Sequence, residues 1–365
     1  MQLKDWDEKS FIRQVLGRFA ATARSDDFDD AVIVDLAEIT DQPDARLLVY
    51  SMDQPSFVQS PNPAVDPFRF YGSWIAGVTC NDVIAMGARC RGFSLALAAP
   101  SDLQTAQVEA LLGGITDVLD HCGAAYEGGN LDSGQLNAVG MAWGLVPRQG
   151  IIRRVGARPG DAIVVTGELG LGWLEYHARK HKLLDQLSTQ DTERFRHYKD
   201  MPVGAAAAIA AAAERGLFTS GMDLSDGLIE FLYTIVSRSG AGCVIDLLSL
   251  PVSPTTRRNL PILLSILPDS ADVLKRHPEL IAFDLGYDSP LRHAFTTPAG
   301  QVAEAARIFA DHGASLHVIG RVAAQPRVLA DFGDGRRAEI PAFWDDQYRQ
   351  EDKLTAWSTF LQAFR

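Results

Sequence analysis

Hydrophobic positions in the first part of the chain follow two spacings. Apolar runs rich in β-branched residues predict strands over 31–39, 45–52, 92–100 and 135–146. Longer segments with apolar residues at helical spacing predict helices over 6–23, 68–88 and 102–122. Strands and helices alternate, so this part is expected to form a mixed sheet packed against helices.

A turn-rich stretch over 147–161 predicts a change of structural unit. Beyond it, strands are predicted over 162–170, 243–251, 293–298 and 316–322, with helical material over 172–215, 228–240, 252–280 and 300–312. A length of 365 residues favours two domains, at roughly 100–200 residues per domain. We therefore expect an N-terminal domain (1–147), a C-terminal α/β domain (148–345) and a peripheral helical tail (346–365). The similar order of elements in the two halves permits two related domains.

The excess of acidic over basic residues narrows the classes of molecule that the protein is expected to bind. The formal net charge is -12 and no run of Lys or Arg interrupts it, which argues against a nucleic-acid partner. No segment approaches 18 consecutive apolar residues, and the N-terminus is polar, so neither a membrane span nor a signal sequence is predicted. The expected location is the cytoplasm.

Four cysteines, Cys80, Cys90, Cys122 and Cys243, are far apart in the sequence and fit no metal-binding spacing. They are expected to be buried, reduced thiols of a cytosolic protein.

The candidate chemistry lies in short acidic segments at predicted element boundaries. They are Asp29-Asp30, Ser51-Met52-Asp53, Asn81-Asp82, Gly128-Gly129-Asn130 with Asp132, and Asp223-Leu224-Ser225-Asp226-Gly227. Aspartate oxygens are the hard ligands that Mg²⁺ prefers, and ATP-handling sites often hold more than one such ion. Taken alone, an aspartate before a helix is more often a helix cap than a metal ligand. Asp82 is the exception, because it lies inside an apolar helix pattern where a buried carboxylate needs a partner.

Several common sites are absent from the sequence. The chain has no GKS or GKT loop, which argues against a P-loop nucleotide site. The glycines of 166–172 lack the dinucleotide-binding spacing, and there is no G-x-S-x-G hydrolase elbow.

Together these segments resemble the superfamily of aminoimidazole ribonucleotide synthetase, selenophosphate synthetase, a hydrogenase maturation protein and thiamine-monophosphate kinase. The resemblance is carried by DDAVIV, NDVIAMGA, RRVGARPGDAIVVTGELG and MDLSDGLIEFLYTI. The DLSDGL string is most similar to thiamine-monophosphate kinase. The resemblance implies a two-domain α/β (α+β) synthetase-related fold, a homodimer formed through the N-terminal sheets, and ATP with several Mg²⁺ ions in a cleft beside that interface.

The resemblance also assigns roles by position. It implies Mg²⁺ ligands at Asp30, Asp53, Asp82, Asn130, Asp223 and Asp226, of which Asp30 and Asp226 are also the candidate catalytic residues. It implies ATP contacts at Ser51, Met52, Gly128, Gly129, Arg154 and Ser225. For Arg154, the sequence alone favours a solvated charge at a domain junction.

The chain departs from the family pattern at two places. Asn130 stands where the family has an aspartate, so one metal site loses a charge, which Asp132 could replace. On the acceptor side, Tyr287 stands where the family has a glutamate; it is followed by Asp288, and Pro290 stiffens the turn. Tyr287 and Asp288 are the candidate substrate contacts.

These features predict an ATP- and Mg²⁺-dependent phosphotransferase acting on a small molecule other than thiamine monophosphate. Two alternatives stay open: an ATP-dependent ligase or cyclase, and a nucleotide-binding protein without turnover. The sibling activities that need a reactive terminal cysteine fit worse, because the first cysteine is Cys80 and the chain ends in QAFR.

Overall fold

The structure is a computed structural model of the whole chain, and it describes residues 29–37, 46–57, 66–192, 203–283, 292–342 and 353–365. The predicted helix over 6–23 lies outside the described residues. Among the helices that are described, none is long and apolar enough to cross a membrane.

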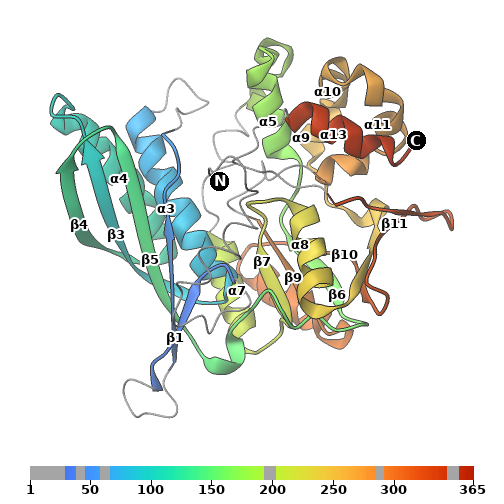
Figure 1. The fold of residues 1–365 in the computed structure, drawn as a ribbon, viewed down its shortest axis with the longest axis horizontal. Coiled ribbons are helices and arrows are strands. Elements are labelled where there is room, and N and C mark those ends of the chain that lie inside the picture. Colours follow the sequence, from blue (N-terminus) through green and yellow to red (C-terminus); the bar gives the residue numbers. More distant parts are fainter. Residues whose placement is uncertain (1–28, 38–45, 58–65, 193–202, 284–291, 343–352) are drawn as a thin grey trace, which may run out of the picture.

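The described elements form two sheets with helices against them (Figure 1). The first sheet consists of β1 (Val32–Asp35), β2 (Leu47–Asp53), β3 (Arg89–Ala99), β4 (Ala125–Ser133) and β5 (Asn137–Val146). The second consists of β6 (Ala162–Thr166), β7 (Ser220–Asp223), β8 (Gly242–Asp246), β9 (His293–Thr297), β10 (Leu316–Ala323), β11 (Val328–Asp331) and β12 (Arg337–Glu339). The α-helices are α3 (Pro67–Ala85), α4 (Thr105–Cys122), α5 (Leu171–Lys180), α7 (Val203–Glu214), α8 (Leu228–Thr234), α9 (Pro254–Arg258), α10 (Leu260–Ile266), α11 (Ala271–Arg276), α12 (Val302–Asp311) and α13 (Lys353–Gln362).

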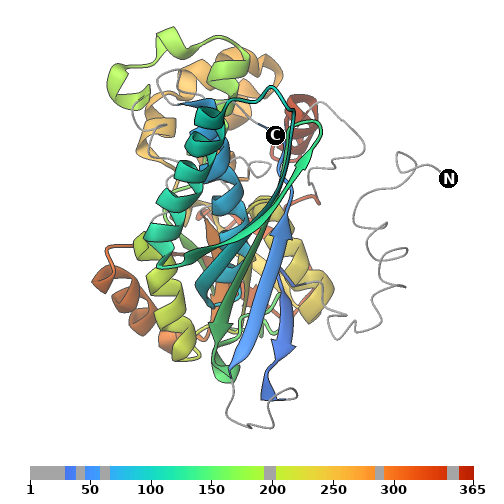
Figure 2. The ribbon, with the colours of Figure 1, turned by 90° about the vertical axis from the view of Figure 1, so that its left-hand side faces the viewer.

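The first sheet has the strand order β1-β2-β5-β3-β4 and is antiparallel except for the β3–β4 pair. Burial alternates along β5, so one face of the sheet is buried and the other is partly open. Helices α3 and α4 pack together over the buried face, as the turned view in Figure 2 also shows. None of the helices in the described part of the chain covers the opposite face.

Close packing of α3 against α4 depends on two glycines. A Cβ on Gly72 would lie 1.9 Å from the carbonyl oxygen of Leu111, and a Cβ on Gly114 would lie 1.9 Å from that of Arg69. Any side chain at either position would push the helices apart. Asp66 starts α3 by accepting hydrogen bonds from the backbone N–H groups of Phe68 and Arg69, with Pro67 in the first turn.

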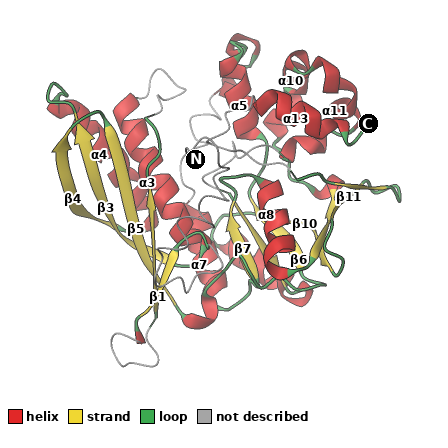
Figure 3. Cartoon of the chain, viewed as in Figure 1, coloured by secondary structure: helices red, strands yellow, loops and turns green. Residues whose placement is uncertain are grey.

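The second sheet has the order β12-β11-β8-β10-β6-β9-β7 and carries helices on both faces (Figure 3). One hydrophobic core joins side chains of α7 and α12 with those of α3, α4 and the first sheet. The other core lies under α5, α8 and the short helices α9–α11. The shared first core explains why the two halves meet along α3.

The described part of the predicted C-terminal tail contains helix α13, which packs into the second core. Trp357 and Leu361 of α13 are fully buried in the second core, and the indole N–H of Trp357 donates to the carbonyl of Phe283 at 3.1 Å. Burying an indole with its N–H satisfied stabilises the attachment of the tail to the second core.

The predicted α/β architecture with two sheets is confirmed, with two local differences. Gly128-Gly129-Asn130 lies inside strand β4 and not in a turn, because this glycine-rich segment pairs with β3 across a register irregularity. Helix α4 begins at Thr105 and not at residue 102, because Gln104 caps it through a capping box with Gln107.

Candidate active site

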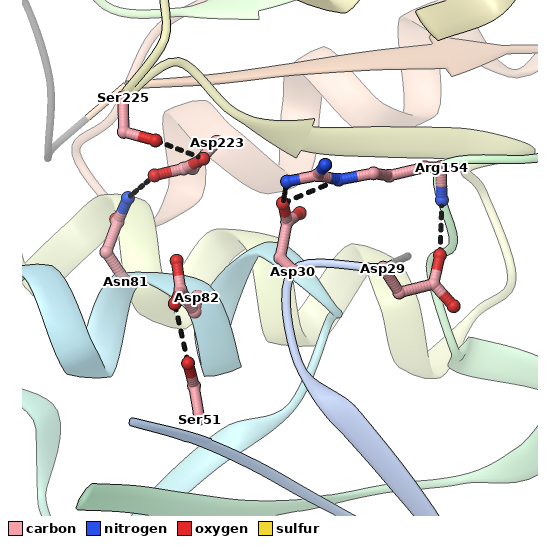
Figure 4. A network of polar contacts seen from close by, with 8 residues as sticks. All are labelled: Asp29, Asp30, Ser51, Asn81, Asp82, Arg154, Asp223 and Ser225. Carbon is pink, nitrogen blue, oxygen red and sulfur yellow. Dashed lines mark hydrogen bonds and ion pairs between the residues drawn. The ribbon is translucent and has the colours of Figure 1, made fainter. Parts of the chain in front are cut away.

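Segments far apart in the sequence meet where the two halves of the chain join (Figure 4). The contributing residues precede β1 (Asp29, Asp30), end β2 (Ser51, Asp53), lie on α3 (Asn81, Asp82), follow the first sheet (Arg153, Arg154) and end β7 (Asp223, Ser225, Asp226). We call Asp30, Asp53, Asp82, Asp223 and Asp226 the aspartate cluster.

The turn after β7 fixes Asp223 and Ser225. Gly227 has a φ of 87°, which favours glycine, and its N–H donates to the carbonyl of Leu224 at 3.0 Å. Within this turn the Ser225 hydroxyl donates to Asp223 Oδ1 at 2.9 Å. Asp223 Oδ2 accepts from Nδ2 of Asn81 at 3.1 Å, so this carboxylate links β7 of the second sheet to α3 of the first half.

Alternation along β2 turns Ser51 and Asp53 toward α3. The Ser51 hydroxyl donates to Asp82 Oδ2 at 2.6 Å. Burial raises the pKa of Asp53, and a hydrogen bond with Asp82 opposes that rise. Two carboxyl groups can share a hydrogen bond when one of them holds a proton, so this pair favours a protonated state in the absence of a cation.

The adjacent carboxylates Asp29 and Asp30 hold two arginines. Asp29 accepts from Nη1 of Arg153 at 3.1 Å and from the backbone N–H of Arg154 at 2.8 Å. Asp30 accepts from Nε of Arg154 at 2.9 Å and forms an ion pair with the same guanidinium, while the Asp30 side chain is only 1% exposed. Segment 153–154 runs beside β7, because the N–H of Gly221 donates to the carbonyl of Arg153 at 2.9 Å.

Mutual repulsion makes the cluster electrostatically costly without a cation. Burial raises the pKa of Asp82 well above its ordinary value, and the charges of Asp223, Asp53 and Asp30 raise it further. Burial, followed by the charge of Asp30, also raises the pKa of Asp223 to about 8.

Arg154 is the one cation that Figure 4 shows among these carboxylates. Burial alone would lower the pKa of Arg154, but the negative charges of Asp30, Asp223 and Asp226 outweigh it and raise the pKa.

The donor set suits Mg²⁺. Oδ2 of Asp30 and Oδ2 of Asp53 are buried and have no hydrogen-bond partner among the described residues. Such oxygens are costly to bury unless a ligand pairs with them. Across the described ranges, no three acidic, histidine or cysteine side chains already converge at metal-ligand distances. Ser51 orients Asp82, Asn81 and Ser225 orient Asp223, and Arg154 holds Asp30.

Four residues predicted for the site face away from the cluster. Met52 lies on the open face of the first sheet, where it is 61% exposed and pairs with Met141. Gly128, Gly129 and Asn130 lie on the edge strand β4, and Asn130 pairs with Ala96. Because β5 and β3 separate β2 from β4, Asn130 is about 14 Å from β2 at the usual strand spacing. One chain therefore does not bring Asn130 to the ion that Asp53 could hold.

Tyr287 and Asp288, the candidate substrate contacts, lie outside the described residues. Conversely, three residues to which the resemblance assigned no role contribute contacts at the site. Asn81, Asp29 and Arg153 each bind a neighbour of the cluster or a member of it. The sequence could have indicated them by position, because each stands directly before a residue that the resemblance selects.

Comparisons with known proteins place the chain among related sequences. Residues 28–146 match the family described as AIR synthase related protein, N-terminal domain, and residues 158–331 match its C-terminal domain. A protein named thiamine-monophosphate kinase from Halobacterium salinarum is 32% identical over 280 residues, which covers 76% of this chain and 83% of that relative.

Solved structures agree in fold. The crystal structure of thiamine-monophosphate kinase from Stenotrophomonas maltophilia K279a aligns with a TM-score of 0.66 and 25% identity, covering 89% of this chain and 96% of that one. The structure of AaThiL complexed with AMPPCP and TMP aligns with a TM-score of 0.69 over 92% of this chain and 98% of that one. At 19% identity, the second similarity shows a shared fold.

Proposed function

The chain belongs to the AIR synthase-related family, and we propose that it is an ATP- and Mg²⁺-dependent kinase of the thiamine-monophosphate kinase type. The observation that carries the proposal is the aspartate cluster. Carboxylates from separate elements are buried together, raise one another's pKa, and leave two buried oxygens that no described residue pairs with. Such a cluster is stabilised by divalent cations, and bound Mg²⁺ would offset the charge of a triphosphate.

Each group of residues has a distinct part in this proposal. Asp30, Asp53, Asp82, Asp223 and Asp226 would hold the ions, with Ser51, Asn81 and Ser225 orienting the carboxylates. Arg154 would supply positive charge for the phosphates of ATP. Catalysis then consists of positioning and charge stabilisation, without a covalent enzyme intermediate.

Thiamine monophosphate is the acceptor that we propose to test first. The relative that shares 32% identity over 83% of its length is named for this substrate. The replacement of the expected glutamate by Tyr287 predicts a different acceptor, since a carboxylate suits the cationic thiazolium ring better than a phenol does. That residue lies outside the described ranges, and no comparison supports the exclusion of thiamine monophosphate.

Two experiments test the function. Calorimetry of ATP binding in the presence of Mg²⁺ should show a loss of affinity for Asp82→Asn and Asp226→Asn of at least roughly 10–100-fold, the loss typical of removing even an outer partner of a metal site. Asp161→Asn is the matched control: Asp161 is also buried, but it accepts from Thr219 and Arg158 outside the cluster. Unchanged affinity in both cluster variants would remove these residues from the site.

Incubation with ATP, Mg²⁺ and thiamine monophosphate then identifies the acceptor. Formation of thiamine diphosphate supports the proposed substrate. ATP binding without that product would favour the prediction from Tyr287, and a screen for metabolites that accelerate ADP release would follow. ADP release that requires an amine or amide partner would favour the ligase alternative, whereas binding without ADP release under any condition would indicate a protein without turnover.

We also propose a homodimer formed through the open face of the first sheet. Leu48, Tyr50 and Met52 of β2 lie opposite Leu145, Trp143 and Met141 of β5, which makes a continuous apolar strip on a face that no described helix covers. Contiguous exposed apolar surface of this kind marks an interaction site. Met52 and Asn130 both lie on this face, so a dimer would bring them toward the partner and not toward their own aspartate cluster.

A further inference from the structure

Three of the four cysteines meet in the first half, although the sequence separates them widely. Cys80 lies on α3, Cys90 on β3 and Cys122 at the end of α4. The sulfur atoms of Cys80 and Cys90 are 3.5 Å apart, and the Cys80 thiol also shares a hydrogen bond with Cys122. All are free thiols, and the described residues around them form no metal-binding group. Cys243 is buried elsewhere, in β8 of the second sheet.

A pocket gives this thiol group a route to solvent. It has a volume of about 460 Å³ and lies between β3, the end of α4 and α7; Cys90, Cys122, Arg91 and His121 are among its lining residues. Cys122 is half-buried, whereas Cys80 is fully buried and Cys90 is 3% exposed. A small solute in the pocket therefore reaches Cys122 before it reaches Cys80.

We propose that Cys122 is a site of reversible oxidation by hydrogen peroxide, and that Cys80 resolves the oxidised form as an intramolecular disulfide. The hydrogen bond with Cys80 favours the Cys122 thiolate, lowering the pKa of Cys122 against the opposing effect of burial. Arg89 and Arg91 line the same pocket and place positive charge there, against the single carboxylate of Asp120.

The reaction balances with peroxide as the only oxidant. The Cys122 thiolate attacks one oxygen of hydrogen peroxide, so the O–O bond breaks, a sulfenic acid forms and hydroxide leaves. The Cys80 sulfur then attacks the Cys122 sulfur, so the S–O bond breaks and the S–S bond forms. The hydroxyl leaves as water with the Cys80 proton. Overall, two thiols are oxidised and one peroxide is reduced to two water molecules.

The disulfide would act on the aspartate cluster through the chain itself. Cys80 directly precedes Asn81 and Asp82, which hold Asp223 and Ser51. A covalent bond from Cys80 to the end of α4 restrains this turn of α3, so oxidation is expected to lower ATP turnover several-fold. This last step rests on the proposed kinase activity, whereas the disulfide does not.

The test uses the full-length protein, reduced, exposed to hydrogen peroxide and then alkylated. Peptide mapping by mass spectrometry is expected to find a Cys80–Cys122 disulfide that dithiothreitol removes. Cys122→Ser should abolish the bond, while Cys243→Ser, which removes a buried thiol outside the group, should leave it unchanged. In Cys80→Ser the sulfenic acid has no resolving partner, so dimedone should label Cys122.

Two results would overturn the proposal independently of any kinase assay. One is complete alkylation of Cys122 after peroxide treatment under conditions where free glutathione is oxidised. The other is a disulfide that joins Cys90 to Cys80 and persists in Cys122→Ser. If the Cys80–Cys122 disulfide forms in a protein that turns over ATP and the turnover does not fall, the link from Cys80 to Asp82 is wrong.

Discussion

Asp223→Asn is expected to stabilise the metal-free protein while abolishing its stabilisation by Mg²⁺ and ATP. Asp223 is 3% exposed, and its pKa is raised from 3.8 to about 8, first by burial and then by Asp30. The folded, metal-free protein therefore holds this proton more tightly than the unfolded chain does. A raised carboxyl pKa means that stability is complete below about pH 4 and falls as the pH rises toward 8.

The size of the stability cost follows from the raised pKa of Asp223. At 1.36 kcal/mol for each pKa unit, Asp223 costs on the order of 4 kcal/mol of stability at neutral pH relative to a carboxyl with its ordinary pKa. Asparagine removes this cost at every pH. It keeps one oxygen acceptor for Asn81 or Ser225 and loses the other, at about 1 kcal/mol. The variant should gain ~1–3 kcal/mol near neutral pH, which raises the melting temperature by roughly 2–4 °C per kcal/mol.

Thermal unfolding in EDTA between about pH 5 and 8 measures the effect. The melting temperature of the wild type should fall with increasing pH, and that of Asp223→Asn should fall less steeply and lie above it at the alkaline end. Saturating Mg²⁺ and ATP should raise the wild-type value and leave the variant unchanged. Asp161→Asn should lose stability at every pH. A wild-type pH slope in Asp223→Asn, or stabilisation of this variant by Mg²⁺ and ATP, would contradict the raised pKa of Asp223 or its place in the metal site.

Two further predictions concern the neighbouring arginine and the open sheet face. Arg154→Met leaves the buried Asp30 without its cation, so it should destabilise the metal-free protein by ~3–5 kcal/mol in urea unfolding and weaken ATP binding; a loss of ATP affinity with unchanged stability would contradict the ion pair. Met141→Glu places a charge on the apolar strip and should give a monomer by light scattering at micromolar concentration, whereas Val318→Glu, at an exposed apolar position of the second sheet, should not; a wild-type monomer with full activity would refute the dimer.

The sequence was most informative where a site residue and its partner are neighbours in the chain. Asp223 and Ser225 share one turn, and the hydrogen bond between them follows from a short motif. Asp82 stood out because a carboxylate in an apolar helix needs a partner, and that partner is Ser51, 31 residues earlier. The identity of such partners depends on how β2 packs against α3, which a pattern of hydrophobic positions does not specify.

Strand alternation explains why Met52 and its two neighbours lie on opposite faces of the sheet. Residues 51–53 look like one functional segment in the sequence, but consecutive side chains of a strand point to opposite faces. Ser51 and Asp53 therefore face α3, while Met52 faces the open side of the sheet. Asn130 lies away from the aspartate cluster for another reason. Its segment contains two glycines, which are typical of a turn, but it pairs with β3 as an edge strand.

The three neighbouring cysteines also show that sequence patterns do not predict contacts between separate elements. Cys80, Cys90 and Cys122 follow no spacing that predicts contact, since each lies on a different element. Their meeting depends on β3 starting beside the end of α3, and on α4 ending beside both, a relation fixed by the close approach of α3 and α4 at Gly72. Patterns of residue type thus predict contacts between residues that are neighbours in the sequence. Contacts between separate helices and strands depend on how those elements pack. The members of the aspartate cluster were selected by the family resemblance, which relates positions on separate elements that residue patterns alone do not connect.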